Sequence, residues 1–455
     1  MRRRAAAVGA AAGLALSTVA MVLGGVLPPG TPDWVGPALL GVAWLGFALG
    51  VAFVPHTSHR SGVVLVVLGA VALLFAAGLG PPRSSDDLYR YQWDGRVQAA
   101  GFDPYRYAPS APELAGLRDG YLWPERSNWC VSPGAVDVET GEALLPGCTL
   151  INRPTVHTIY PPGAQLMFHG LHRLSPTGTG SWPVRVMAGL AALATTLLLM
   201  LGLRRLGYDP RRAVLWAWCP LVAFETASNG HIDVAAAFLT TAALLVVAVD
   251  GVRRQWWGGL LLGLAVITKL TPLAVVPSVA RIRVLVALST VVGLAYLPYV
   301  VLGGAQALGY LGGYAAEEGY TDGSRFALLP VPGPVAPWLA AVLAAIIAVG
   351  AWRRAATRRP WNAAALSTGG LLLVATPSYP WYALLLVALV ALGARVEWLA
   401  VAAAGYVAQY GDRFGLSHPL AHRIGYGLAV IAVVAGWWWR RRGLAARAVL
   451  VREGS

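Results

Sequence analysis

Long apolar runs alternate with short polar stretches along most of the chain, and this pattern is its strongest structural signal. Many of the runs reach or approach the about 20 residues that a helix needs to cross a lipid bilayer. They predict an all-α, polytopic membrane protein with about 12 to 14 transmembrane helices. The predicted spans are 5–27, 34–54, 61–79, 183–203, 212–228, 233–250, an interrupted pair at 256–267 and 270–280, 284–302, 333–351, 363–376, 381–394, 396–410 and 421–439.

A long polar region separates the third and fourth predicted spans. It begins with a loop over 80–156, followed by a short amphipathic helix near 159–172. No internal repeat and no separate soluble domain is visible in the sequence. The pattern divides the chain into the first three helices (1–79), a loop region with short helices (80–182), the remaining bundle (183–442) and a tail (443–455).

Composition supports this membrane assignment. The chain is 57% hydrophobic and 12% charged, whereas soluble domains carry roughly 25% charged residues. Its net charge of +14 comes almost entirely from arginine, and the arginines lie mainly in short loops, as the positive-inside rule expects of cytoplasmic loops. The charge therefore does not indicate a nucleic-acid partner. It predicts a multi-pass plasma-membrane protein with both termini cytoplasmic and the 80–156 loop outside. This topology requires 256–280 to enter and leave the membrane as two short helices with Lys269, the only lysine, near the turn.

The three cysteines fall in two environments. Cys130 and Cys148 share the long polar loop, where a disulfide is plausible if the loop is extracytoplasmic. Cys219 lies in an apolar run, and no cysteine spacing indicates zinc.

The loop opens on a charged stretch that runs from Ser84 to Arg96. Ser84 or Ser85 can cap a helix whose first turn carries Asp86 and Asp87, where the helix dipole favours acidic side chains. Such a helix puts Asp86 and Arg90 on one face and Asp87 and Asp94 on another. Taken alone, it also fits an amphipathic surface helix with ordinary ion pairs.

Other ionisable and aromatic residues gather at the same predicted membrane boundary. A charged residue inside a membrane segment indicates a functional site by default, although Lys269 could equally extend to the interface. His231 and Asp233 fit a helix start as well as substrate binding, and His157 and Tyr160 fit a rigid turn as well as a site. The candidate residues outside the first charged stretch are His157, Tyr160, His231, Asp233, Lys269, Arg325 and Tyr379.

These residue types suit the transfer of a sugar from a lipid phosphate. One carboxylate takes the proton of the acceptor hydroxyl, and cations hold the phosphate before and after it leaves. Phosphate is already a good leaving group, so the general acid of a glycosidase pair is unnecessary. Lys269, Arg90, Arg96 and His231 are the candidate phosphate ligands, and Asp94, Tyr160, His157, Asp233, Tyr379 and Arg325 the candidate substrate contacts.

Five short motifs occur in a fixed order along the chain. They are Asp86-Asp87-Leu88-Tyr89-Arg90-Tyr91, Gly101-Phe102-Asp103-Pro104-Tyr105, Ile159-Tyr160-Pro161-Pro162, Gly230-His231-Ile232-Asp233 and Thr268-Lys269-Leu270-Thr271-Pro272. Over about residues 60–400 the set resembles the GT-C superfamily of membrane glycosyltransferases. It is most similar to actinobacterial polyprenyl-phosphomannose-dependent α-mannosyltransferases and their glycosyltransferase-87-like relatives.

The resemblance implies a GT-C-like bundle and a catalytic base in the first large extracytoplasmic loop. That base maps to Asp87 or to Asp86, and Asp87 is favoured because it stands directly before Leu88-Tyr89. The resemblance further implies a polyprenyl-monophosphate sugar donor, inversion in a single displacement, no cofactor beyond the lipid-linked donor and no catalytic metal. Two departures concern the acceptor: three spans precede the loop instead of one, and the insert around 110–150 has no counterpart.

The sequence therefore predicts an inverting hexosyltransferase. It would move a hexose, with mannose favoured, to a glycan or glycolipid acceptor at the extracytoplasmic face during cell-envelope glycan synthesis. Arabinose, glucose or an amino sugar stay open. The alternative is a polyprenyl-linked lipid flippase or secondary transporter, which would use the same intramembrane cation and broken helices. The long loop beginning at Asp86 and the absence of a repeat favour the enzyme.

Overall fold

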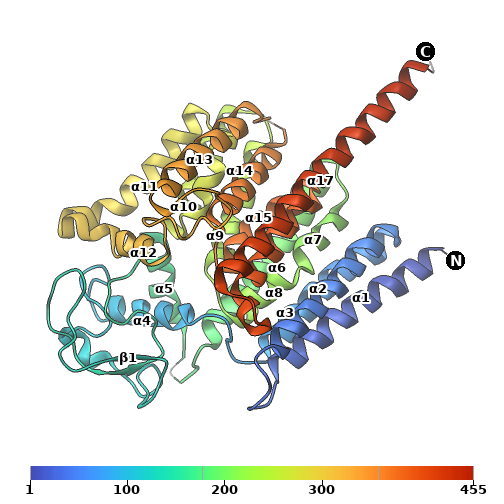
Figure 1. The fold of residues 1–455 in the computed structure, drawn as a ribbon. Helices are drawn as coiled ribbons and strands as arrows, with labels where there is room; N and C mark the ends of the chain where they lie inside the picture. The colour runs from blue at the N-terminus through green and yellow to red at the C-terminus, as the bar shows by residue number, and fades with distance from the viewer. Residues whose placement is uncertain (1, 177, 357, 454–455) are drawn as a thin grey trace.

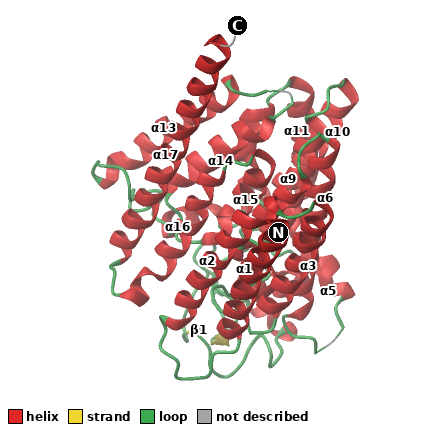
Figure 2. Ribbon diagram, turned by 90° about the vertical axis from the view of Figure 1, so that its right-hand side faces the viewer, coloured by secondary structure: helices red, strands yellow, loops and turns green. Residues whose placement is uncertain are grey.

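The computed structural model describes residues 2–453 except 177 and 357, and for residues 2, 302, 303, 305, 306 and 443–453 it describes the backbone alone. Almost all regular structure is helical (Figure 2). The helices are α1 (Arg2–Gly25), α2 (Val35–Phe53), α3 (His59–Gly78), α4 (Asp87–Ala99), α5 (Pro162–Leu174), α6 (Trp182–Arg205), α7 (Val214–Ala217), α8 (Pro220–Ala223), α9 (Asp233–Val247), α10 (Val252–Thr268), α11 (Ile282–Gly303), α12 (Leu311–Glu317), α13 (Ala336–Arg353), α14 (Pro360–Ala375), α15 (Leu384–Gly393), α16 (Leu399–Tyr410) and α17 (His418–Glu453). The strands are β1 (Trp129–Val131) and β2 (Gly147–Thr149), which pair antiparallel.

Seven helices in the described part of the chain are long and apolar enough to cross a membrane. They include α1, α2, α3, α6, α11, α13 and α17. Large apolar side chains on their outer faces are exposed, such as Phe75 at 69% and Trp338 at 75%, and a surface of this kind fits contact with lipid. The all-α, multi-pass membrane architecture predicted from the sequence is confirmed.

The other predicted spans coincide with shorter or interrupted helices. Residues 212–228 form a 3₁₀ turn, α7, α8 and a π-helical turn (Phe224–Ser228). Residues 256–280 are broken as predicted: α10 ends at Thr268, Lys269 is extended, and a 3₁₀ helix (Thr271–Val279) follows. Pro272 and Pro277 account for the second half, because proline removes the N–H that an α-helix would use.

The bundle is built around α15. Nine consecutive residues, Leu384 to Leu392, are at most 2% exposed. A helix that is apolar on every side is stable only when it is surrounded, and α15 packs against α6, α7, α9, α14 and α16. In Figure 1, α1 to α3 lie along one flank of this core, and the red α17 extends away from it. The described part of the predicted tail continues α17 as helix to Glu453.

Residues 80–182 form a cap at one end of the bundle, which we call the loop end. It contains α4, the β1–β2 hairpin and α5 (Figure 1). Gly95 allows α4 and α5 to touch, because a Cβ there would lie 2.3 Å from the backbone oxygen of Phe168. The rings of Tyr91 and Phe168 stack in the same contact, with 4.6 Å between their centroids. This packing fixes the direction in which the start of α4 points.

Candidate active site

A polar cavity of about 210 Å³ lies at the loop end of the bundle. Its wall combines the start of α4, the segment 152–160, Lys269, α12 and the residues before α15. Asp86, Asp87, Arg90, His157, Tyr160, Lys269 and Tyr379 line it, as predicted site residues that the structure brings together.

The two adjacent carboxylates differ in their contacts. The side-chain amide of Asn152 donates to Asp87 Oδ1 at 2.6 Å, and Asp87 Oδ2 lies 3.7 Å from His231 Nδ1. Asp86 Oδ2 instead accepts the indole N–H of Trp129 at 2.9 Å. Burial raises the pKa of Asp86 and the charge of Asp87 adds to this, while the Trp129 hydrogen bond opposes it. Asp87 is therefore held by an amide and lies beside a histidine, whereas Asp86 is held by an indole.

The predicted serine cap is only partly confirmed. The helix begins at Asp87, with Asp86 in the cap position and no side-chain cap bond. Ser85 Oγ accepts the N–H of Asp87 at 3.2 Å, while Ser84 Oγ contacts the side-chain amide of Asn229. Ser84 is thus used for a tertiary contact, which a local capping rule does not anticipate.

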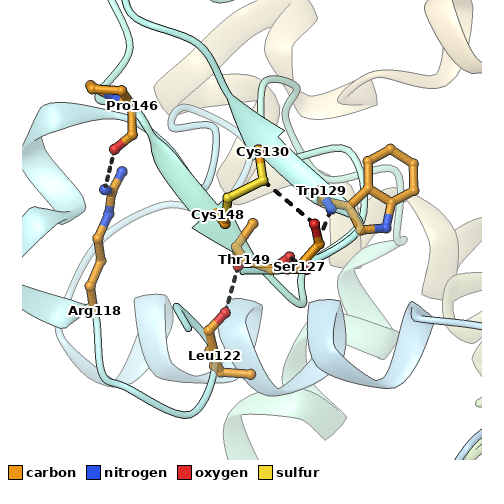
Figure 3. Close-up of a disulfide and its surroundings, with 8 residues drawn as sticks. All are labelled: Arg118, Leu122, Ser127, Trp129, Cys130, Pro146, Cys148 and Thr149. Atoms are coloured by element: carbon orange, nitrogen blue, oxygen red, sulfur yellow. Dashed lines mark hydrogen bonds between the residues drawn. A yellow bond between two sulfur atoms is a disulfide. The ribbon is translucent and has the colours of Figure 1, made fainter. Parts of the chain in front are cut away.

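The β1–β2 hairpin holds Trp129 in place. The predicted disulfide between Cys130 and Cys148 is present and joins the two strands (Figure 3). The Ser127 hydroxyl donates to the backbone oxygen of Thr149 beside it. The disulfide and this hydrogen bond therefore stabilise the hairpin that positions the indole of Trp129 beside Asp86.

Arg90 and Asp94 form part of the framework beside the cavity. The Arg90 guanidinium pairs with Asp94 at 3.0 Å and donates to the backbone oxygens of Arg153 and Val156 at 3.3 and 3.0 Å. Asp94 Oδ2 accepts the Thr158 hydroxyl at 2.7 Å. The predicted separate faces of α4 are thus joined by an i,i+4 ion pair, and together they hold the segment 152–158 against α4.

His231 lies directly behind Asp87. It is fully buried, stacks on Trp381 with 4.0 Å between ring centroids, and has Nε2 3.4 Å from Glu225 Oε2. Glu225 is also fully buried and accepts the Tyr406 hydroxyl at 2.7 Å. The π-helical turn and Gly230, at φ +72°, bring Glu225 and His231 to the same side of the chain. Asp87, His231 and Glu225 form a row that leads from the cavity into the bundle.

Lys269 stands where two cavities meet. Its ammonium lies 3.2 Å from Asp233 Oδ2 and 5.1 Å from the ring centre of Tyr160. A second cavity of about 470 Å³, lined mainly by apolar residues of the 3₁₀ helix, α12 and α14, shares this wall with the polar cavity. The shared residues are Ile159, Tyr160, Lys269, Tyr314 and Tyr382.

Glu318 connects two other candidate residues, Arg325 and Tyr379. Its Oε2 pairs with Arg325 at 2.7 Å, and its Oε1 accepts the Tyr379 hydroxyl at 3.0 Å and lies 3.3 Å from Arg153. Arg325 is 6% exposed and does not line the cavity. The Arg325 charge is therefore used in the ion pair with Glu318 in this structure.

The structure places Arg96 away from the polar cavity. Its guanidinium pairs with Asp119 and donates to the backbone oxygen of Leu117 at 3.0 Å. Asp94, His231 and Asp233 lie behind the cavity lining as partners of residues that form it, whereas Arg325 pairs with Glu318, which does not line the cavity. His157 lines the cavity while its ring nitrogens face Asp137 and Glu139.

Several residues at the site were missed by the sequence analysis. Glu225 could have been found, because an acidic residue inside a predicted span is rarely without function. The others have no local signal, since their importance depends on partners far along the chain. They are Trp129, Asn152, Arg153, Glu318, Trp381 and Tyr406.

Of the three comparisons with known proteins, one finds a match. No curated protein and no solved structure matches the chain. The model of glycosyltransferase family 87 matches residues 158–377, which contain Tyr160, His231, Lys269 and Arg325. The predicted resemblance is thereby confirmed over residues 158–377, where this multi-pass membrane protein is similar to glycosyltransferase family 87, and the match indicates a glycosyltransferase.

Proposed function

We propose that the chain transfers a hexose, with mannose favoured, from a polyprenyl-monophosphate sugar to a glycan or glycolipid acceptor. The reaction takes place at the extracytoplasmic face of the plasma membrane, where the arginine distribution puts the loop end. The observation that carries the donor class is the position of Lys269 between a polar and a mainly apolar cavity.

A lipid phosphate sugar has three parts, and each matches one part of this wall. The apolar cavity offers room for the isoprenoid units nearest the phosphate, among side chains such as Leu273 and Leu372. Lys269 has three N–H donors, of which the contact to Asp233 uses one, so the others can bind phosphate oxygens. The sugar then occupies the polar cavity beside Asp87.

Asp87 takes the role of the base. It accepts the proton of the acceptor hydroxyl as that oxygen attacks the anomeric carbon on the face opposite the phosphate. The bond between the anomeric carbon and the phosphate oxygen breaks, and polyprenyl phosphate leaves with the electron pair. One displacement inverts the centre, so a β-linked donor gives an α-linked product.

His231 and Glu225 support this step from behind the base. Trp381 covers one face of the His231 ring, and Glu225 lies 3.4 Å from its far nitrogen. The proton that Asp87 takes up can pass to His231, beside which the buried Glu225 carboxylate lies. The pair thus provides a place for the proton that Asp87 collects.

The test is a reconstituted transfer assay. Protein purified into nanodiscs receives synthetic polyprenyl-phosphate mannose, then the glucose and arabinose analogues, with membrane glycolipids as acceptors. Mass spectrometry should show a sugar-extended acceptor together with released polyprenyl phosphate. Turnover with a nucleotide sugar and with none of the lipid phosphates would refute the donor class. Movement of the lipid across vesicles without any transfer would favour the flippase alternative.

A further inference from the structure

A compact turn in the loop end presents two carboxylates to a buried histidine. Inside the β1–β2 hairpin, the N–H of Asp137 bonds to the backbone oxygen of Glu142 at 2.8 Å. Asp137 Oδ1 accepts the N–H groups of Glu139 and Thr140 at 2.8 and 3.1 Å. These bonds occupy one oxygen and leave Oδ2 directed at His157, 3.1 Å from its Nε2. The orientation of Asp137 is therefore built into the turn.

His157 is enclosed by this turn. The residue is 2% exposed, Asp137 is 4% exposed, and Glu139 Oε2 lies 2.6 Å from His157 Nδ1. Neither ring nitrogen makes a hydrogen bond of acceptable geometry, although an oxygen lies close to each. The oxygens therefore lie off the N–H directions. One ligand atom from each of the three residues lies within 4.8 Å of the others.

The charges of the cluster are not balanced by the protein. Among the residues that the structure describes, no arginine or lysine forms an ion pair with Asp137 or Glu139. The two carboxylates carry two negative charges, one of them on the buried Asp137, and an uncompensated buried charge is costly. A divalent cation with a neutral imidazole and two carboxylates leaves none.

We propose that Asp137, Glu139 and His157 bind a divalent transition-metal ion, with Zn²⁺ as the best-matched ion. One imidazole nitrogen and two carboxylate oxygens form a three-ligand set of the kind that zinc accepts, with water in the fourth position. Glu139 is the exposed ligand and gives the ion a path of entry.

This ion would act as a clamp, separate from the sugar transfer. His157 lies two and three residues before Ile159 and Tyr160 in the cavity wall, whereas Asp137 and Glu139 belong to the disulfide-bonded hairpin and do not line the cavity. Binding would fasten the hairpin to the wall segment at a second point. Because a metal that binds only the folded state adds its binding free energy to stability, the clamp should stiffen the loop end.

The test measures Zn²⁺ binding to the full chain, purified without a histidine tag and stripped with chelator. Competition with a chromogenic chelator should show one high-affinity ion per chain, weakened at least about tenfold in Asp137→Asn and His157→Gln. Glu139→Gln, at the exposed ligand, serves if those variants fold poorly. Asp119→Asn, a carboxylate of the same region that pairs with Arg96, should bind Zn²⁺ as the unchanged chain does.

A second measurement follows the hairpin itself. Zn²⁺ should slow amide hydrogen exchange over residues 129–149 in the unchanged chain and not in the variants. Equal Zn²⁺ affinity in the unchanged chain and all ligand variants, or no binding in the unchanged chain, would overturn the proposal. Either result is independent of whether the protein transfers mannose.

Discussion

The ion pair of Lys269 and Asp233 allows the structural and the substrate-binding roles of the lysine to be separated. Lys269→Met removes the ammonium and leaves Asp233, whose side chain is 3% exposed, without its partner. Removing one member of a buried pair costs about 3–5 kcal/mol. Asp233 is the first residue of α9, where the helix dipole can return up to about 2 kcal/mol. The expected loss of unfolding free energy is therefore about 1–5 kcal/mol.

The double variant Lys269→Met with Asp233→Asn should recover most of that stability. Both charges are gone, and a neutral replacement of a buried ion pair is often close to neutral in free energy. Donor affinity should not recover, because the phosphate still lacks its cation. A hydrogen bond to a charged group contributes about 1.5–3 kcal/mol, which predicts about 10- to 100-fold weaker donor binding.

The assay combines two readouts on the same preparations. Thermal unfolding in detergent reports stability, and calorimetric titration in nanodiscs with polyprenyl-phosphate mannose reports donor binding. A double variant that regains both stability and donor affinity would show that Lys269 only neutralises Asp233. Lys269→Arg is the control, because it keeps the charge and should keep the stability.

Three further predictions concern the loop end. Asp87→Asn should lower kcat by about 10²–10⁴-fold with donor binding unchanged, whereas the matched Asp86→Asn should lower it by less than about tenfold; the reverse order would move the base by one residue. Because the pKa of Asp86 is raised above its ordinary 3.8, its ionised form costs stability as pH rises through the folded-state pKa. Asp86→Asn should therefore unfold at a higher temperature than the unchanged chain near neutral pH, and the difference should vanish below pH 3.8. Replacing both Cys130 and Cys148 by serine opens a link with a sequence separation of 18, worth about 3 kcal/mol in the chain-entropy estimate. Faster amide hydrogen exchange at Trp129 should show that the hairpin is less stable without the disulfide. Unchanged exchange would mean that the strand pairing alone stabilises the hairpin.

The fold could be predicted from sequence as far as it depends on local composition. Apolar length predicted the positions of the long membrane helices, and the broken pair around Lys269 follows from two prolines in its second half. What local rules could not give is the interruption of 212–228 by a π-helical turn. That region is one apolar run in the sequence, and its contacts are with distant segments: the indole N–H groups of Trp216 and Trp218 donate to the backbone oxygens of Ala192 and Val66.

The sequence predicted which residues lie close together in the candidate site better than it predicted their individual contacts. The sequence brought Asp87, Tyr160 and Lys269 to one end of the bundle because topology alone does so. It assigned Arg90 and Arg96 to phosphate, whereas the structure uses Arg90 for Asp94 and backbone oxygens and Arg96 for Asp119. A cation in a sequence shows only that a charge exists. Which anion it pairs with is decided by the tertiary fold.

His231 and Glu225, the two residues behind Asp87, likewise depend on contacts from several helices of the bundle. Glu225 is 181 positions from Tyr406 and belongs to a different helix, yet its buried carboxylate depends on that hydroxyl for a hydrogen bond. A charge at this depth is stable only when several elements supply partners to it. His231 is likewise held by Trp381, which precedes α15. The helices of the bundle therefore do more than anchor the loop end: they supply partners to the ionisable groups behind Asp87, and a change at Tyr406 should reach Asp87 through Glu225 and His231.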